Sequence, residues 1–549
     1  MKDGKRERTT RAGLWVLLGI AVMGMSLDTV AAKGPEVPEL FVTSDRCLAC
    51  HNDLITPSGQ NVSIGANWQS SMMAHSARDP YWQAAVRREC LEHPESSEAI
   101  QDECSACHMP MARYQAKTAG GQGAVFVHLP FLPVATPLHQ LSVDGVSCTM
   151  CHQIQPDKLG TPESFTAGFV VDAAKPLGQR DVYGPYDIDA GRTRVMRSSA
   201  LVVPQQQLHV QDSALCGSCH TLFTHTRAPG GEIIGELPEQ VPYLEWQHSA
   251  YNDTKHCQSC HMPQLDEPMN ITSVLGQDRE QFSRHVFRGG NFLMPKIFSR
   301  NRVDLGVVAL PQDLDNASTQ TLHNLAENTA RLTIERADVA DGRLMLDVKI
   351  TQLAGHKLPT AYPSRRVWLH VALTDRNGRV VFESGKFQTD GAIAGNDNDA
   401  DPTRFEPHYA RIETPDQVQI YEAIMADAEG HVTTGLLRAL RFVKDNRILP
   451  DGFDKATADD DIAVRGRAMQ DADFVAGTDT VQYALSLDGV ELPVQVKAEL
   501  WYQPIGYRWA QNLREQQAAE IERFIKYYDD MAALSGAMLA EVSQIVDGR

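Results

Sequence analysis

Ten of the eleven cysteines occur in five copies of one pattern, Cys-x-x-Cys-His. Two thiols three positions apart on a turn or short helix can add to the two vinyl groups of one haem, and the next histidine then lies under the iron as its first axial ligand. One motif can arise by chance, but five complete copies predict five covalently attached haem c groups. The predicted attachment cysteines are Cys47, Cys50, Cys104, Cys107, Cys148, Cys151, Cys216, Cys219, Cys257 and Cys260, and the predicted iron ligands are His51, His108, His152, His220 and His261.

Three other uses of paired cysteines fit this pattern less well. Disulfides form in exported proteins, but they need no histidine after each second cysteine. Zinc sites combine two Cys-x-x-Cys units into one set of four ligands, and five units do not divide into such sets. Thioredoxin-like redox motifs rarely occur five to a chain. The eleventh cysteine, Cys90, is predicted to be a buried free thiol, because the motifs leave it no partner.

A low-spin haem needs a second axial ligand, which multihaem cytochromes usually take from another histidine. Of the 19 histidines, five belong to the motifs, so 14 remain as candidates. His128 lies in an apolar run, where an unbonded imidazole would be costly. His285 begins a Gly-rich segment that would let a haem approach the backbone, and His356 in a Pro-rich turn would let the C-terminal part clamp a haem. The predicted second ligands are His93, His128, His209, His285 and His356.

Other side chains remain open for the same role. Met72 and Met73 lie beside His75, and a methionine ligand would raise the reduction potential of its haem. For each candidate histidine the alternative is a surface or hydrogen-bonded side chain without iron. The reserve candidates are His75, His139, His225, His248 and His256.

Six stretches between Cys47 and about Asp375 carry a wider pattern: Trp82 to Cys107, Asp144 to Ile154, Tyr243-Leu-Glu-Trp246, Cys257-Gln-Ser-Cys-His-Met-Pro263, His285-Val-Phe-Arg-Gly-Gly-Asn291 and Gly355 to Arg366. In these stretches the chain resembles multihaem cytochromes of the cytochrome c554 type. The resemblance implies electron transfer through haems with two histidine ligands, and related enzymes oxidise or reduce small nitrogen compounds.

The elements that must position these residues differ along the chain. Around the motifs, loops rich in Pro and Gly predominate and long periodic helices are scarce, so the haems must supply much of the core. Past Leu322, apolar residues alternate with polar ones in three runs, 344–350, 367–373 and 494–502, which predict antiparallel strands. From Ala510 to Val546 the chain has no proline, and apolar residues at helical spacing predict one long amphipathic helix.

These patterns predict a multidomain α+β fold. A loop- and helix-rich multihaem domain is followed by a β-sandwich-like domain and a C-terminal helix. The predicted bounds are 1–32 for a signal peptide, 33–322 for the pentahaem domain, 323–508 for the β-sandwich-like domain and 509–549 for the helix.

The N-terminus has the form of a secretory signal. Basic residues from Lys2 to Arg11 precede an apolar stretch of 13 residues, Gly13 to Met25, and Val30-Ala-Ala32 offers a cleavage site. The alternative is an uncleaved membrane anchor, but a membrane-spanning helix needs about 20 apolar residues. We therefore expect a periplasmic or extracellular protein, where haem c is attached.

The formal net charge is −19, which does not suit nucleic acid or anionic lipid as partners. The expected partners are other cytochromes or membrane redox complexes, and self-association into a haem filament is a further option. The acidic segment 395–402, with Asp397, Asp399 and Asp401, could offer ligands to calcium. It lacks the glycine and glutamate of an EF-hand loop, so a solvated loop is the favoured interpretation.

Two functions follow from this pattern. In the first, all five irons have two protein ligands and the protein transfers electrons along a close-packed row of haems between redox partners. In the second, one haem lacks the second ligand and the protein is an oxidoreductase that acts on a small nitrogen or sulfur compound there. We favour electron transfer, and no residue is assigned a catalytic role.

Overall fold

The computed structural model describes residues 38–129 and 136–547. The predicted signal peptide, residues 1–32, lies outside the described residues. Among the helices of the described residues, no helix is long and apolar enough to cross a membrane. The described chain has helices and several sheets, so its fold is α+β as predicted.

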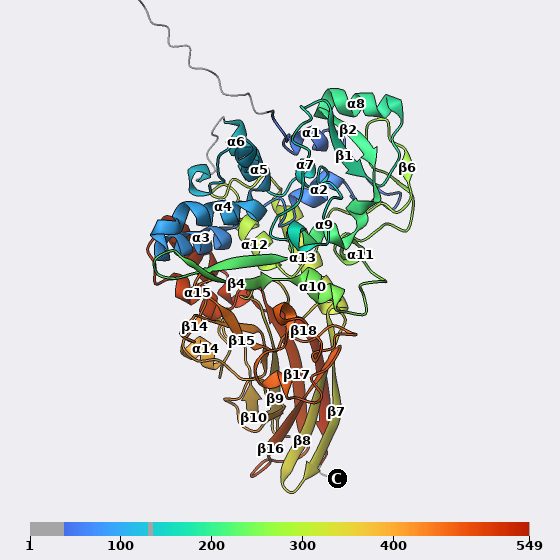
Figure 1. The fold of residues 1–549 in the computed structure, drawn as a ribbon. Helices are drawn as coiled ribbons and strands as arrows, with labels where there is room; N and C mark the ends of the chain where they lie inside the picture. The colour runs from blue at the N-terminus through green and yellow to red at the C-terminus, as the bar shows by residue number, and fades with distance from the viewer. Residues whose placement is uncertain (1–37, 130–135, 548–549) are drawn as a thin grey trace, which may run out of the picture. The chain divides into compact units, whose positions relative to one another are not determined.

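Residues 38–310, which we call the motif region, consist mainly of short helices joined by loops (Figure 1). The longer ones begin with local signals; in α3, Pro80 opens the first turn and Asp79 accepts hydrogen bonds from two backbone N–H groups. The helices are α1 (Asp45–Leu48), α2 (Ile64–Gln69), α3 (Pro80–Glu92), α4 (Ser97–His108), α5 (Pro110–Thr118), α6 (Pro137–Val143), α7 (Cys148–Cys151), α8 (Ala190–Ala200), α9 (Ser213–Gly217), α10 (Pro242–Gln247), α11 (Cys257–His261) and α12 (Leu293–Arg300).

Three pairs of strands stiffen the loops of the motif region. The first pair is parallel and the other two are antiparallel. They are β1 (Arg180–Gly184) with β2 (Val202–Gln206), β3 (Leu222–Arg227) with β4 (Ile233–Gln240), and β5 (Met269–Asn270) with β6 (Asp278–Arg279).

Two larger sheets follow the helix α13 (Pro311–Asn328), which runs across the predicted boundary at residue 322. One has the order β11-β16-β8-β7, and the other has the order β10-β9-β17-β18 with β12 beside β9. We call them together the strand-rich region. Their strands are β7 (Ala330–Ala340), β8 (Arg343–Gln352), β9 (Arg366–Thr374), β10 (Val380–Ser384), β11 (Arg411–Ile412), β12 (Ile420–Tyr421), β16 (Thr478–Ser486), β17 (Val494–Gln503) and β18 (Ala537–Val546).

The three alternating runs of the sequence form β8, β9 and β17, as predicted. The apolar residues of β8 and β16 in one sheet and of β9 and β17 in the other belong to one buried cluster. Two sheets that face each other across a shared apolar core form a sandwich-like arrangement. A small third sheet, β13 (Ala423–Ala426), β14 (Val432–Thr433) and β15 (Arg441–Asp445), together with α14 (Asp397–Ala400), lies in the long connections.

The prediction of one long C-terminal helix is wrong. Helix α15 (Tyr507–Leu513) and helix α16 (Ala519–Asp529) are separate, and residues 537–546 form β18, which pairs with β17 along its whole length. The helical spacing that ends at Tyr528 is real, since α16 buries Ile521, Phe524 and Tyr528. Beyond it, the free edge of β17 supplies hydrogen-bond partners, and that tertiary pairing decides the structure of a segment without proline.

Candidate haem-binding site

Each Cys-x-x-Cys-His motif lies in or directly after a short helix, namely α1, α4, α7, α9 and α11. In the first, third and fourth motifs the histidine N–H donates to the carbonyl of the first cysteine, at 2.8–3.0 Å. A single helical turn of this kind places both thiols and the histidine on one side of the chain. The local structure therefore agrees with the spacing argument for haem attachment.

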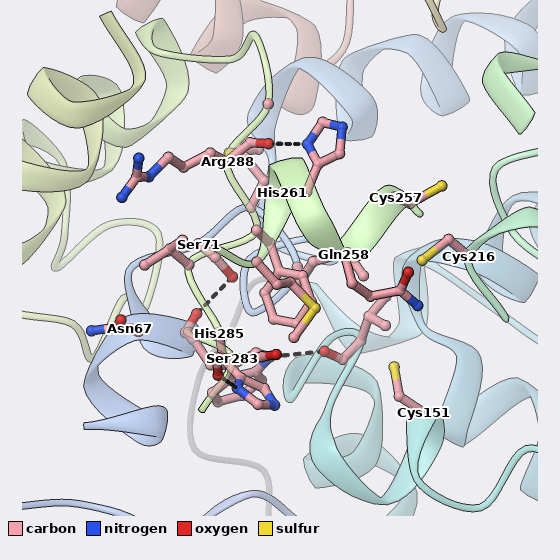
Figure 2. Close-up of a pocket in the computed structure, with 18 of the residues that line it drawn as sticks. Asn67, Ser71, Cys151, Cys216, Cys257, Gln258, His261, Ser283, His285 and Arg288 are labelled. Atoms are coloured by element: carbon pink, nitrogen blue, oxygen red, sulfur yellow. Dashed lines mark hydrogen bonds between the residues drawn. The ribbon is translucent and has the colours of Figure 1, made fainter. Parts of the chain in front are cut away.

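All ten motif cysteines and all five motif histidines line one cavity of about 1490 Å³. Protein interiors are normally close-packed and contain few voids larger than a water molecule. A cavity of this size, walled by five copies of a haem-attachment motif, therefore needs a large resident group to fill it. Figure 2 shows part of this cavity, with residues of the third, fourth and fifth motifs in its wall.

The motif histidines are prepared to bind a metal through one nitrogen. Four of them donate a hydrogen bond from Nδ1 to a backbone carbonyl: His51 to Ile271 at 2.6 Å, His108 to Ser76 at 2.9 Å, His152 to Tyr183 at 2.6 Å, and His261 to Arg288 (Figure 2). A proton fixed on Nδ1 leaves Nε2 with a free lone pair, which is the usual arrangement for a metal-binding histidine.

Burial also favours the neutral, metal-binding form of the motif histidines. It lowers the pKa of all five, and the pKa of His108 and of His220 falls to about 4 each. A neutral imidazole can bind iron near neutral pH, whereas the protonated ring has no lone pair to offer.

Two of the predicted second ligands face a motif histidine at a suitable distance. The rings of His152 and His285 are nearly parallel, at 20°, with 6.4 Å between their centroids. His261 and His356 have the same angle and a separation of 6.3 Å. An imidazole nitrogen lies about 2 Å from a bound metal, so two rings on opposite sides of one metal have centroids about 6 Å apart. Both pairs therefore leave room for a single iron.

The other three predicted second ligands do not line the cavity. His209 donates from Nε2 to the Ile154 carbonyl at 2.8 Å, while its Nδ1 is buried without a partner. His128 is buried, and its ring lies 5.8 Å from that of His139. Their role as ligands stays a prediction.

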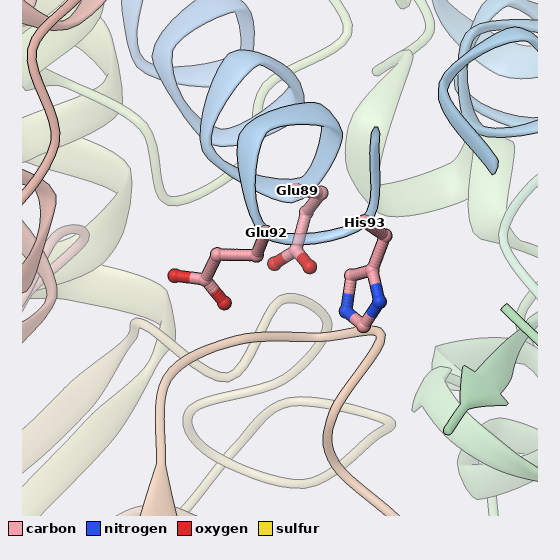
Figure 3. A group of neighbouring side chains, drawn as sticks. All are labelled: Glu89, Glu92 and His93. Atoms are coloured by element: carbon pink, nitrogen blue, oxygen red, sulfur yellow. The ribbon is translucent and has the colours of Figure 1, made fainter. Parts of the chain in front are cut away.

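His93 is buried at the end of α3, and neither of its ring nitrogens has a hydrogen-bond partner. Figure 3 shows its ring beside the Glu89 carboxylate, with Glu92 on the other side of Glu89. This group offers three ligand atoms, but Glu89 already accepts from the Leu436 and Leu437 N–H groups and Glu92 accepts from Arg88. Three of the four carboxylate oxygens accept from protein donors, and only Glu92 Oε2 is buried without a hydrogen-bond partner. We therefore retain His93 as a candidate iron ligand.

The reserve candidates have varied surroundings. His256 lines the cavity. His75 is buried against Phe298, and burial lowers its pKa to about 3. His225 contacts Glu103, and His248 contacts the Asp454 carbonyl at 3.2 Å.

The cavity wall contains arginine side chains that form no ion pair with a carboxylate of the described chain. Arg284, Arg288 and Arg365 line the cavity, and no ion pair joins any of them to a carboxylate of the described chain. Burial lowers the pKa of Arg284 and of Arg288. A guanidinium without a counter-ion is costly away from water, and each haem would bring two propionate carboxylates to such a site.

Thiols of different motifs lie next to one another across the cavity. Cys47 of the first motif is beside Cys148 of the third, Cys107 of the second is beside Cys219 of the fourth, and Cys216 of the fourth is beside Cys257 of the fifth. Figure 2 shows the last of these pairs. Cys151 of the third motif also lies near Cys219. The motifs are therefore close neighbours: the first lies beside the third, the third lies near the fourth, and the fourth lies beside the second and the fifth.

A group of buried acids in the cavity wall near the second motif was missed by the sequence reasoning. Burial raises the pKa of Glu89 and of Glu239 to about 7 each, and that of Asp79 to about 6. A signal was present for Glu239, because it follows the buried Leu237 of β4 by two residues and precedes the buried Val241 by two, which places it on the same face of the strand. A carboxylate on the apolar face of a strand indicates a functional site, because packing alone does not require a charged group there.

The calcium prediction finds no support. Asp399 is held by Arg366 at 2.7 Å, Asp397 pairs with Arg404 at 2.6 Å, and Asp401 accepts from the Thr403 N–H and hydroxyl. Each carboxylate is directed to a protein donor of its own, so the three do not converge on a cation.

Comparison with known proteins gives one structural match. No protein-family model matches the chain, and no curated protein matches it. Among solved structures, it is similar to a penta-heme cytochrome c552 from Thermochromatium tepidum, with a TM-score of 0.50 and 16% sequence identity over 93% of this chain and 100% of that chain. The chain therefore shares the fold of that penta-heme cytochrome.

Proposed function

We propose that this chain is an exported c-type cytochrome that binds five haem c groups covalently and transfers electrons along them. The observation that carries the proposal is the single cavity whose wall contains all five Cys-x-x-Cys-His motifs and two histidine pairs at the spacing of axial ligands. The fold similarity to a penta-heme cytochrome supports it. The haems would supply the redox chemistry, and the chain supplies thioether attachment, axial nitrogens and cations for the propionates.

The neighbouring thiols suggest the order of the haems. The first motif is beside the third, the third is near the fourth, and the second and fifth are both beside the fourth. We propose that electrons pass between the first and third haems and reach the fourth, which branches to the second and the fifth. Other cytochromes or membrane redox complexes would donate and accept electrons at the ends of this network, and self-association would extend it.

The mass of the denatured protein tests haem attachment against the disulfide alternative. The protein is expressed with its signal peptide in a host that has haem-attachment machinery. We expect the mass of the chain after removal of the signal peptide plus five haems, with one free thiol at Cys90. The same neighbouring thiols could instead form three disulfides, which would lower the mass by six hydrogens and leave no haem absorbance.

A second candidate function is an oxidoreductase with one haem open to a small nitrogen or sulfur compound. The buried acids Glu89, Glu239 and Asp79 favour this alternative, because they line the cavity near the second motif and could hold protons there. Electron paramagnetic resonance of the oxidised protein separates the two functions. Five low-spin signals would exclude the enzyme, and a high-spin signal that shifts with nitrite or hydroxylamine would exclude electron transfer alone.

A further inference from the structure

The loop that contains His356 connects β8 to β9, so it belongs to the strand-rich region and reaches into the cavity. Two hydrogen bonds within this region hold the residue: the Gln352 amide donates to the His356 carbonyl at 2.8 Å, and the His356 Nδ1 donates to the Lys357 carbonyl at 3.0 Å. These bonds orient the ring locally. They do not fix the loop relative to His261, which lies on α11 of the motif region.

Glu245 of the motif region fixes the His356 loop relative to the part of the chain that carries His261. It lies on α10, between the fourth and fifth motifs, and is completely buried. Its Oε2 accepts hydrogen bonds from the backbone N–H of Lys357 at 3.1 Å and from the hydroxyl of Thr360 at 2.5 Å. One carboxylate oxygen of the motif region therefore holds the His356 loop at two points, Lys357 and Thr360.

Three further charges from outside the motif region surround Glu245. Arg447 lies 2.8 Å from Oε1 of Glu245 and 2.7 Å from Asp445, and Lys357 lies 2.7 Å from the same Asp445. All four side chains are at least nine-tenths buried, and two positive charges face two negative ones.

Buried ion networks are poor sources of stability, because the cost of removing charges from water offsets their attraction. Apolar side chains of the same size would stabilise this interface at least as well. A buried network is better suited to fixing one geometry out of several, and the geometry fixed here is the position of the His356 loop.

We propose that Glu245 is a positioning residue that holds His356 at axial-ligand distance from His261, with Arg447, Asp445 and Lys357 holding the Glu245 carboxylate in place. This inference rests on the proposed function and deepens it. It assigns to a carboxylate between the fourth and fifth motifs the task of placing a ligand that comes from a different region of the chain.

The test uses the purified holoprotein with its full haem content. Glu245→Ala removes both acceptor atoms, Glu245→Gln keeps an acceptor oxygen but loses the charge, and Thr360→Val removes one donor. His356→Ala defines the spectrum of a haem without this ligand. Glu422→Gln is the matched control, since Glu422 also pairs with a buried lysine, Lys444, next to Asp445 on β15. Successive side chains of a strand point to opposite faces, so this pair lies away from the Glu245 network.

We expect His356→Ala to convert one of the five low-spin haems to high-spin in electron paramagnetic resonance. Glu245→Ala should give the same high-spin signal at most of that intensity, and added imidazole should restore the low-spin signal in both. Glu245→Gln and Thr360→Val should give smaller fractions, in that order, or a changed set of low-spin g-values. Glu422→Gln should retain the spectrum of the natural protein.

Two results would overturn the proposal in different ways. If His356→Ala gives a high-spin haem and the Glu245 and Thr360 variants do not, His356 is a ligand but Glu245 does not position it. If His356→Ala keeps five low-spin haems, His356 is no ligand and the axial assignment of the proposed function fails as well. Should Glu245→Ala not fold, the two milder variants decide between these outcomes.

Discussion

The motif region and the strand-rich region differ in what fills their cores. In the strand-rich region, apolar residues of facing sheets form one continuous buried cluster, to which α3 and α12 of the motif region also contribute. In the motif region, several small separate clusters surround a cavity of about 1490 Å³. Helices α1 and α7 have four residues each, far below the length at which an isolated helix is stable. The sheets are therefore packed on side chains, whereas we expect the motif region to depend also on groups bound in its cavity.

Loss of one haem should be the most damaging change. Replacing both Cys148 and Cys151 by alanine would remove the haem of the third motif and leave part of the cavity unfilled. Loss of so many packing contacts should cost several kcal/mol, which is a large part of the total stability of a typical domain. We expect the motif region to become sensitive to protease. A variant that loses one haem and keeps its protease resistance would contradict the dependence on bound groups.

A substitution that creates a cavity in the strand-rich region should lower the stability of the fold without affecting the haems. Leu346 in β8 is completely buried, and Leu346→Ala should lower the free energy of unfolding by about 2–5 kcal/mol. Because the sandwich core is made of side chains alone, the haem absorbance and the haem content should stay unchanged. Denaturant unfolding followed by tryptophan fluorescence and by haem absorbance measures both effects. Loss of haem from this variant would show that the two cores are not independent.

Replacement of a second ligand should change one haem without disturbing the fold. In His285→Met, the thioether should raise the reduction potential of the haem held by His152, by on the order of 100 mV. Spectroelectrochemical titration should then resolve one shifted component and four unshifted ones. His323→Met is a suitable control, because His323 is exposed on α13. An identical titration for His285→Met and the control would remove His285 from the axial ligands.

The smallest expected effect is a pH dependence of the strand-rich region. Burial alone would raise the pKa of Glu499 in β17, but hydrogen bonds from Lys497, His370 and Trp501 outweigh it and lower the pKa to about 2. A lowered acid pKa stabilises the fold above the pKa of the unfolded chain, and that stabilisation is lost as the pH falls toward 2. After allowance for solvent screening we expect Glu499→Gln to cost at most about 2 kcal/mol at pH 7.

The measurement for Glu499 compares the variant with the natural protein in denaturant at several pH values. The difference between their free energies of unfolding should be largest above about pH 5 and should decrease toward pH 2. A difference that does not change over this range would mean that the carboxylate contributes through packing and not through its charge.

The sequence predicted well whatever depends on neighbours along the chain. Thiol spacing identifies five motifs whose cysteines and histidines all line the cavity, and alternation identifies β8, β9 and β17, because both signals are contained in a few consecutive residues. It predicted poorly what depends on distant partners. His285 was predicted from the Gly-rich segment that it begins and His209 from its place seven residues before Cys216, yet only His285 faces a motif histidine across the cavity. Strand β18 was misread because its structure depends on the free edge of β17.

The hydrogen bonds of the motif histidines have a consequence for the assembly of the protein. In a chain that crosses a membrane N-terminus first, as proposed, His152 meets its carbonyl partner Tyr183 after 31 further residues. His51 must wait for Ile271, which follows 220 residues later. Of these motifs, the first therefore has the longest delay between its own delivery and the delivery of the residue that orients its histidine. Its haem can be joined to the cysteines early, but its spectrum and potential should mature only after nearly the whole motif region has been delivered.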